Sequence, residues 1–300
     1  MAHGSTPPEN GRIRSGDIFL VGAVLAWGIN FPIAKYVLDF MDPVVFSATR
    51  YLTASMLLFG FLLLRNIAIA ISLKEAAMLL LIGLLSVALF QGGWAFGLSL
   101  TSASKASVLI TTSPIFGALI SALMGNRPGK MACFGILLSF FGVAVVINNS
   151  LTEITFSAGS IIGDMLIVAA AMMWAIYTFV AGPLVARRGP LLVTAWANLF
   201  GSVVLMLFGI PSLFEQNWEN ISVLGWMSWA ITAIFGAALA FVWYCAGIAR
   251  LGVTKGMVYS FLIPVIAILS SVILLDEVIT FVQVLGAVIV LIGVKLTRAD

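Results

Sequence analysis

Ten apolar stretches, each long enough to cross a membrane, follow one another along almost the whole chain. The hydrocarbon core of a bilayer is about 30 Å thick, and a helix needs about 20 apolar residues to cross it. Strands of a membrane barrel are about half as long and alternate in polarity. The stretches therefore predict an all-α integral membrane protein with ten transmembrane helices. They lie at about residues 17–38, 44–64, 75–98, 104–124, 131–148, 162–185, 191–210, 221–247, 255–275 and 281–297.

The composition supports a membrane protein. Apolar residues make up 62% of the chain and charged residues 9%, against about 45–50% and about 25% in soluble domains. The net charge of +3 comes from basic residues between the stretches, which indicates contact with lipid headgroups and no nucleic-acid surface. The first stretch is too long for the core of a signal peptide, so we expect it to be retained after a polar tail at 1–16.

The basic residues also predict the orientation of the chain. Loops rich in Lys and Arg stay on the cytoplasmic side of a membrane. With a cytoplasmic N-terminus, twelve basic residues fall on that side, and two, Lys35 and Lys105, fall on the other. Both termini are therefore predicted to be cytoplasmic.

The second half of the sequence repeats the first. Four sets of residues coincide, in the same order, after shifts of 147 to 151 positions. They are Gly16-Asp17 with Gly163-Asp164, Trp27 with Trp174, Lys105 and Pro114 with Lys255 and Pro264, and Gly135 and Gly142 with Gly286 and Gly293. We infer two units, 17–150 and 160–297. Each holds five stretches, an odd number, so the units are inverted repeats, which in secondary transporters place the substrate at their interface near the midplane.

These features resemble the EamA-type members of the drug/metabolite transporter superfamily over about residues 16–297. The resemblance is carried by the two Gly-Asp entries, the matched tryptophans, the two Lys-(eight residues)-Pro helices and the glycine-spaced final helices. It is strongest to bacterial amino acid exporters, especially those for aromatic amino acids, and implies export through the inner membrane by alternating access. The family commonly has an acidic residue after the fourth helix of each unit. Asp276-Glu277 fits, whereas the first unit has Asn126-Arg127.

The sequence pattern does not favour an enzyme. The single histidine, His3, lies in the polar tail, and no cluster of residues has the spacing of a metal site or of a nucleophile with its base. A glycine-rich phosphate loop is absent too. We therefore expect no catalytic residue, metal or other cofactor. The carboxylates lie near the ends of stretches, which favours facilitated transport, or coupling through such a carboxylate, over a proton relay at the midplane.

Polar and aromatic residues inside the stretches are the candidate substrate-binding residues. Trp27 and Asn30 lie one helical turn apart, and the repeat places Trp174 and Tyr177 at the matching positions. The alternative role of a tryptophan is an anchor at the membrane surface. Trp27 lies about ten residues into its stretch, which favours the lining of a central cavity.

The third and eighth stretches add further candidates, which are Gln91, Trp94, Trp243 and Tyr244. The glycines around Gln91 and Trp94 have a structural explanation as well, because they allow helices to approach closely. A Gln-Trp pair that faces a wet cavity is the functional interpretation.

The repeated Lys-(eight residues)-Pro helices supply the remaining candidates. Ser107, Thr111 and Tyr259 are predicted to bind substrate, and Pro114 and Pro264 to act as hinges. The alternative is a tolerated kink with hydroxyls bonded to their own helix.

Three basic side chains at or near helix ends remain to be explained. Lys105 and Lys255 are expected to extend to the lipid headgroups, or to attract a carboxylate at the mouth of a cavity. Arg50, six residues into the second stretch, is expected to extend likewise or to pair with Asp42.

Together the residues predict a monomeric inner-membrane carrier that exports small amphipathic metabolites, above all amino acids including aromatic ones. Aromatic rings suit the side chains of such substrates, and amide and hydroxyl groups can hold the amino and carboxylate ends without a fixed countercharge. The alternatives are a multidrug or vitamin carrier with the same fold, a lipid-headgroup flippase, and a membrane scaffold without a sealed cavity.

Overall fold

The computed structural model describes residues 9–125, 129–148, 158–251, 259 and 262–296, and the regular structure within them is helical throughout. The first half holds α1 (Glu9–Leu38), α2 (Pro43–Leu64), α3 (Leu73–Gly83), η1 (Leu84–Gln91), α4 (Gly92–Leu100), α5 (Ala103–Ile110), α6 (Ser113–Leu123) and α7 (Lys130–Asn148). The second holds α8 (Ala158–Arg188), α9 (Pro190–Phe208), α10 (Ile210–Glu215), η2 (Trp218–Asn220), α11 (Val223–Ile231), η3 (Thr232–Leu239), α12 (Ala240–Leu251), α14 (Leu262–Leu275) and α15 (Phe281–Leu296).

Eight segments of the described chain are long and apolar enough to cross a membrane. They coincide with the first eight predicted stretches. The last two, α14 and α15, have 14 and 16 residues, and the stretch 255–275 falls partly outside the described residues, so ten spans remain a prediction. Large apolar side chains such as Leu64 and Phe208 are exposed on the outer surface, as contact with lipid requires. Helix α1 already begins at Glu9, within the segment expected as a polar tail.

Two of the long spans contain a π-helical segment. η1 lies within α3–η1–α4, and η3 lies within α11–η3–α12. Each has eight residues, and Leu84 and Thr232, their first residues, are 148 positions apart. A π-helix bonds each amide to the carbonyl five residues back, which is rare and is often found at functional sites. The duplication of the sequence therefore extends to an irregularity of the backbone.

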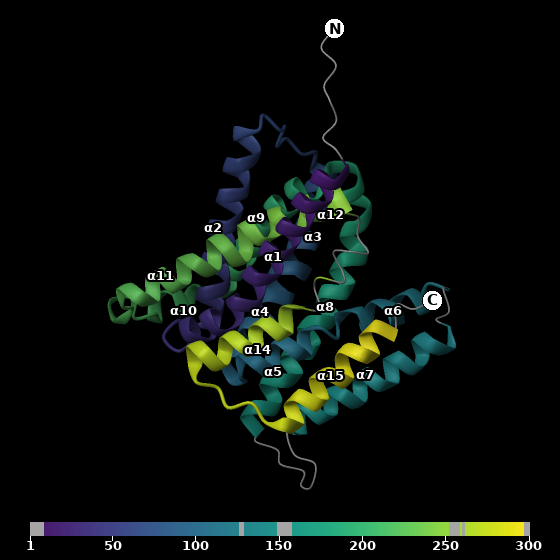
Figure 1. Ribbon diagram of the computed structural model, residues 1–300. Coiled ribbons are helices and arrows are strands. Elements are labelled where there is room, and N and C mark those ends of the chain that lie inside the picture. The colour runs from purple at the N-terminus through teal and green to yellow at the C-terminus, as the bar shows by residue number, and fades with distance from the viewer. Residues whose placement is uncertain (1–8, 126–128, 149–157, 252–258, 260–261, 297–300) are drawn as a thin grey trace.

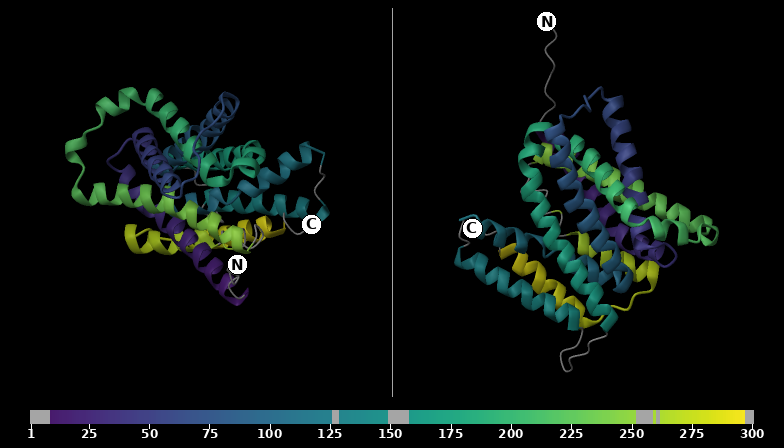
Figure 2. Two further views of the ribbon diagram at one scale, coloured as in Figure 1. Left: turned by 90° about the horizontal axis from the view of Figure 1, so that it is seen from above. Right: turned by 180° about the vertical axis from the view of Figure 1, so that it is seen from behind.

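The first helix of each half packs against the other half of the chain. Helix α1 packs on η3, α12 and α14 of the second half, and α8 packs on η1, α4, α5 and α6 of the first. The second helices, α2 and α9, pack on each other, and so do the last, α7 and α15. Figures 1 and 2 show α7 and α15 side by side. Most of the buried core therefore lies between the halves.

Close backbone contacts between helices depend on glycine. A Cβ atom on Gly163 of α8 would lie 2.8 Å from the Gly97 carbonyl oxygen of α4, and a Cβ on Gly97 would lie 2.8 Å from the Gly163 carbonyl oxygen. Real side chains do not tolerate such distances to backbone atoms. The contact between α4 and α8 therefore requires glycine on both helices, as small-residue contacts in membranes do.

We predict that Gly163→Leu destabilises the protein, because overpacking a tight contact costs about 1–3 kcal/mol. Gly182→Leu on the same helix is the matched control, since a Cβ at Gly182 has no heavy atom within 4 Å apart from its own stretch of helix. The measurement is the thermal unfolding midpoint in detergent. Equal midpoints for the two variants would contradict this account of the α4–α8 contact.

Candidate functional site

The predicted tryptophans on α1 and α8 each lie against the π-segment of the other half. The Trp27 indole Nε1 donates to the Gly236 carbonyl of η3 at 3.0 Å, and its ring centroid is 5.0 Å from that of Tyr244. The Trp174 ring is 4.9 Å from Phe90 of η1 and 4.9 Å from Tyr177. The structure thus brings Trp27 to Tyr244 of the other half, whereas Tyr177 lies next to Trp174 on the same helix and Phe90 supplies the contact of Trp174 with the other half.

Asn30, one turn after Trp27, is buried and holds the side chain of Arg50. Arg50 Nη2 donates to Asn30 Oδ1 at 3.2 Å, and Nε donates to the carbonyl of Thr232, the first residue of η3, also at 3.2 Å. The first prediction for Arg50 is wrong, because its exposed fraction is 2% and it does not extend to headgroups. The second is wrong as well, because the carboxylate of Asp42 accepts from the first amides of α2 and caps that helix.

Trp94 lies near the same guanidinium. Its side chain is buried, its ring meets Phe31 edge to face at 5.5 Å, and Arg50 Cζ lies 5.5 Å from its centroid. Phe46 and Tyr51 of α2 place their rings 5.4 Å and 5.1 Å from Arg50 Cζ. These distances allow cation–π attraction. Asn30, Trp94 and Arg50, with these two rings and η3, form one cluster, named here the Arg50 cluster.

The other candidates of the third and eighth spans lie around this centre. Gln91 ends η1 and is half-buried, and its backbone carbonyl accepts from Ser47 Oγ at 3.4 Å. Trp243 is half-buried, lies 6.5 Å from the Phe235 ring and contacts α1 at Gly22. Neither makes a polar side-chain contact with the Arg50 cluster.

The hydroxyl groups predicted to bind substrate are engaged locally. Ser107 Oγ donates to the Ser104 carbonyl at 2.7 Å, and Thr111 Oγ1 donates to the Val108 carbonyl at 2.6 Å. The first bond lies within α5 and the second joins the residue after α5 to its last turn, and hydroxyls in membrane helices often bond to their own helix in this way. Tyr259 instead reaches across the molecule, since its hydroxyl donates to Asp17 Oδ1 at 2.9 Å.

The two predicted hinge prolines lie at helix starts. α5 ends at Ile110 and α6 begins at Ser113, so the fourth span is broken next to Pro114, the second residue of α6. Pro264 is the third residue of α14 and is buried. The break at Pro114 is present in the structure, and its role as a hinge stays a prediction.

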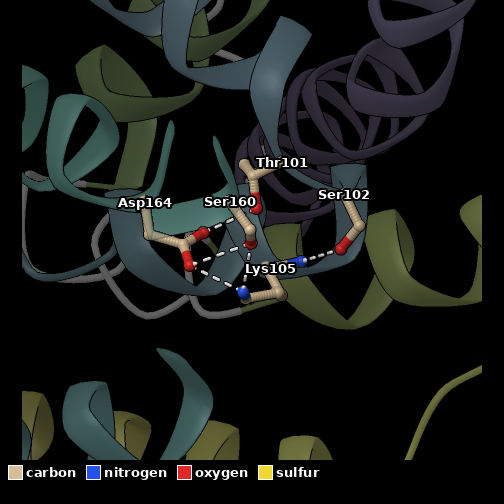
Figure 3. A network of polar contacts seen from close by, with 5 residues as sticks. All are labelled: Thr101, Ser102, Lys105, Ser160 and Asp164. Atoms are coloured by element: carbon tan, nitrogen blue, oxygen red, sulfur yellow. Dashed lines mark hydrogen bonds and ion pairs between the residues drawn. The ribbon is translucent and has the colours of Figure 1, made fainter. Parts of the chain in front are cut away.

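A second polar cluster lies where α5 meets the first turn and a half of α8 (Figure 3). Lys105 Nζ forms an ion pair with Asp164 Oδ2 at 2.6 Å and donates to Ser160 Oγ at 3.0 Å. Thr101 Oγ1 donates to the other carboxylate oxygen of Asp164 at 2.5 Å. The Lys105 and Asp164 side chains are 9% and 0% exposed. The expectation that Lys105 extends to headgroups is therefore wrong, because a carboxylate from the other half neutralises it inside the protein. These four residues are named the Lys105 cluster.

The Lys105 cluster borders a cavity of about 470 Å³. The cavity is also lined by Lys35, Glu277 and Gln283. Glu277 accepts from the amides of Ala103 and Ser104, at 2.7 and 3.1 Å, and so neutralises the positive end of α5. Lys35 Nζ donates to the carbonyls of Leu98 and Ser99, at the end of α4. Lys35 of α1 thus bonds to the end of α4, and Glu277 of the second half bonds to the start of α5, next to this cavity.

Sequence reasoning missed the role of Asp164. It identified the Gly-Asp repeat and the Lys repeat separately. In the structure α8, the first helix of the second half, packs on the first half and brings Asp164 to Lys105. The predicted inverted arrangement of the two units could have indicated that Asp164 and Lys105 meet. Arg50 had only a weak signal, a basic residue well inside an apolar stretch.

Comparison with known proteins identifies the relatives of this chain. The sequence profile of the EamA-like transporter family matches residues 14–148 and again residues 161–299. An uncharacterized transporter of Archaeoglobus fulgidus is 30% identical over 94% of this chain and 96% of its own length. The uncharacterized transporter YyaM of Bacillus subtilis is 26% identical over 92% and 91%. A WAT1-related chloroplastic protein of Arabidopsis thaliana is 26% identical over 93% of this chain and 68% of its own length.

The fold recurs in a solved crystal structure. It aligns with a TM-score of 0.68 and covers 95% of this chain and 96% of the other. The two sequences are 19% identical, so this likeness concerns the fold alone.

We predict that Asp164→Asn lowers the free energy of unfolding by about 3–5 kcal/mol, because it leaves the Lys105 ammonium buried without a countercharge. Replacement of both partners, Lys105→Met with Asp164→Leu, is expected to recover much of this loss. Arg188→Gln is the control, since it removes the better-exposed Arg188–Glu75 pair and is expected to cost far less. Equal losses for Asp164→Asn and Arg188→Gln in detergent unfolding would refute a buried, charge-dependent pair.

Proposed function

Because the chain belongs to the EamA-like transporter family and is a multi-pass membrane protein, we propose that it exports small amphipathic metabolites, above all amino acids including aromatic ones. The proposed site of action is the inner, or plasma, membrane. The carrier works as a monomer by alternating access and has ten transmembrane helices in two inverted units, with both termini cytoplasmic. The family profile supports the unit structure, since it matches each half once.

One observation carries this proposal. The first helix of each half places a tryptophan against the π-segment of the other half, and a second aromatic ring accompanies each tryptophan. A substrate bound between the halves therefore meets aromatic surface for an apolar side chain, together with the polar groups of Asn30 and Gln91. Such pockets, mostly apolar with a few placed polar groups, are typical of small-molecule sites.

Alternating access requires contacts that close one end at a time. The Lys105 cluster joins α5 of the first half to α8 of the second, and so it is suited to hold one end closed. The equivalent position at the other end is Asp17, whose partner in the structure is Tyr259. Lys255, the repeat counterpart of Lys105, lies outside the described residues.

The proposal predicts counterflow of labelled phenylalanine, tryptophan or threonine in liposomes that contain only the purified protein. Trp27→Ala and Trp174→Ala are expected to reduce exchange at least about tenfold, since each removes ring contacts of about 1 kcal/mol together with a large buried area. Trp226→Ala is the control, because Trp226 lies in a half-exposed aromatic group with Trp218 and Trp229, away from both tryptophans.

Other outcomes distinguish the alternatives. Exchange that is unchanged by a proton gradient supports a facilitative carrier, and exchange driven by the gradient supports coupling through a carboxylate near a helix end. Transport of a cationic dye without any amino acid would contradict the substrate class and favour a multidrug carrier. Movement of labelled lipid in the same liposomes would favour a flippase.

A further inference from the structure

The guanidinium of Arg50 is a buried cation with an open hydrogen-bonding position. Its exposed fraction is 2%, and Nη1 has no hydrogen-bond partner among the described residues. The ion pairs of the described chain join Lys105 to Asp164 and Arg188 to Glu75, and neither involves Arg50. Within the part of the chain that the structure describes, the charge of Arg50 is therefore met by two neutral oxygens and three aromatic rings.

Such an arrangement is costly and needs a reason. A charged group inside a membrane protein costs several kcal/mol unless a countercharge and full hydrogen bonding compensate for it. Cation–π contacts and bonds to Asn30 and Thr232 compensate in part. For mechanical support alone, a neutral side chain would join α2 to η3 at lower cost.

The remaining donors of Arg50 can bind an anion. A guanidinium has five N–H donors in a planar fork. Nε is occupied by Thr232 and one donor of Nη2 by Asn30, which leaves the two donors of Nη1 and one of Nη2. A carboxylate next to Nη1 would accept from one of these donors, and two parallel hydrogen bonds through Nη1 and Nη2 form where the free N–H of Nη2 faces the same way.

We propose that Arg50 is the anchor for the carboxylate of the transported substrate. This inference rests on the proposed function and gives its site the fixed countercharge that the neutral candidates lack. The rings of Tyr51 and Trp94, 5.1 Å and 5.5 Å from Arg50 Cζ, lie next to this site. Asn30 holds the fork in place and links it to α1, so that a bound carboxylate acts on the same helix that carries Trp27.

Gly236 of η3 leaves space for the side chains of Asn30 and Arg50. A Cβ there would collide with the Asn30 amide and would lie 3.0 Å from Arg50 Nη2. The glycine lets η3 approach the guanidinium closely enough for the Thr232 carbonyl to accept its bond. Arg50 is thereby fixed by the π-segment of one half, although α2 of the other half carries it.

The first test uses the wild-type protein and matched ligands. Unlabelled phenylalanine is expected to compete with labelled phenylalanine in counterflow at least about tenfold better than phenylalaninamide does, because the amide lacks the negative charge. Arg50→Gln is expected to raise the half-saturating concentration of phenylalanine at least about tenfold and to abolish the preference for the carboxylate, whereas Arg50→Lys keeps part of both.

The control for the variant is Arg65→Gln. Arg65 follows the same helix, is exposed and contacts only the Phe61 ring among aromatic groups. It is expected to behave like the wild type. If Arg50→Gln lowers the unfolding temperature but keeps both the half-saturating concentration and the preference for the carboxylate, Arg50 is structural and the proposal is overturned.

A binding measurement separates this proposal from the proposed function. Thermal stabilisation of the detergent-solubilised wild type is compared for 3-phenylpropanoate and its neutral amide, 3-phenylpropanamide. Stabilisation by the carboxylate alone, lost in Arg50→Gln and kept in Arg65→Gln, supports the anchor even if no amino acid is exchanged. Equal effects of the two ligands, no effect of either, or an unaltered response in Arg50→Gln would overturn it, even where the wild type exchanges amino acids.

Discussion

Polar groups inside this protein depend on the protein itself for their partners, because the surrounding lipid offers none. In the structure, backbone carbonyls of the π-segment η3 and of a helix end accept hydrogen bonds from side chains of other helices. Carbonyls of η3 accept from Arg50 and Trp27, and the last carbonyls of α4 accept from Lys35. Irregular backbone therefore occurs where a charged or aromatic side chain enters from another helix, and this links the π-segments to the candidate site.

The same constraint explains the ion pair of the Lys105 cluster. Lys105 and Asp164 come from different halves, and each would be costly alone. Their pair is satisfied only while α5 and α8 remain together. A contact of this kind favours one arrangement of the halves strongly, and its loss must be compensated elsewhere. The two Gly-Asp sequences, one per half, place such an acid on the first helix of each half.

The sequence predicted much of this structure because its strongest signals are physical requirements of the membrane. Apolar length predicted the first eight spans, and the repeat marked Trp27 and Trp174, which each lie against the π-segment of the other half. The partners of Arg50 and Lys105 were not predicted, because a rule based on single helices assigns such charges to the headgroups. Asp164 and Thr232, which accept from Lys105 and Arg50, lie in the other half, and Asn30 lies on another helix of the same half. Only the packing of the helices reveals these partners. The π-segments have no sequence signature and could not be predicted at all.

The departure of Arg50 from the repeat is itself informative. Pro43 and Pro190 open the equivalent helices α2 and α9, 147 positions apart, and the same shift places Arg50 on Ala197. The tryptophans, the π-segments and the Gly-Asp entries are present twice, as the proposed alternation between two equivalent states would use them. A substrate of the proposed kind carries one carboxylate, and a second buried cation at the repeat position would add its desolvation cost without a second anion to meet it. The duplicated features thus suit the proposed alternating access. Arg50, which has no counterpart in the second half, suits the recognition of a single anionic group.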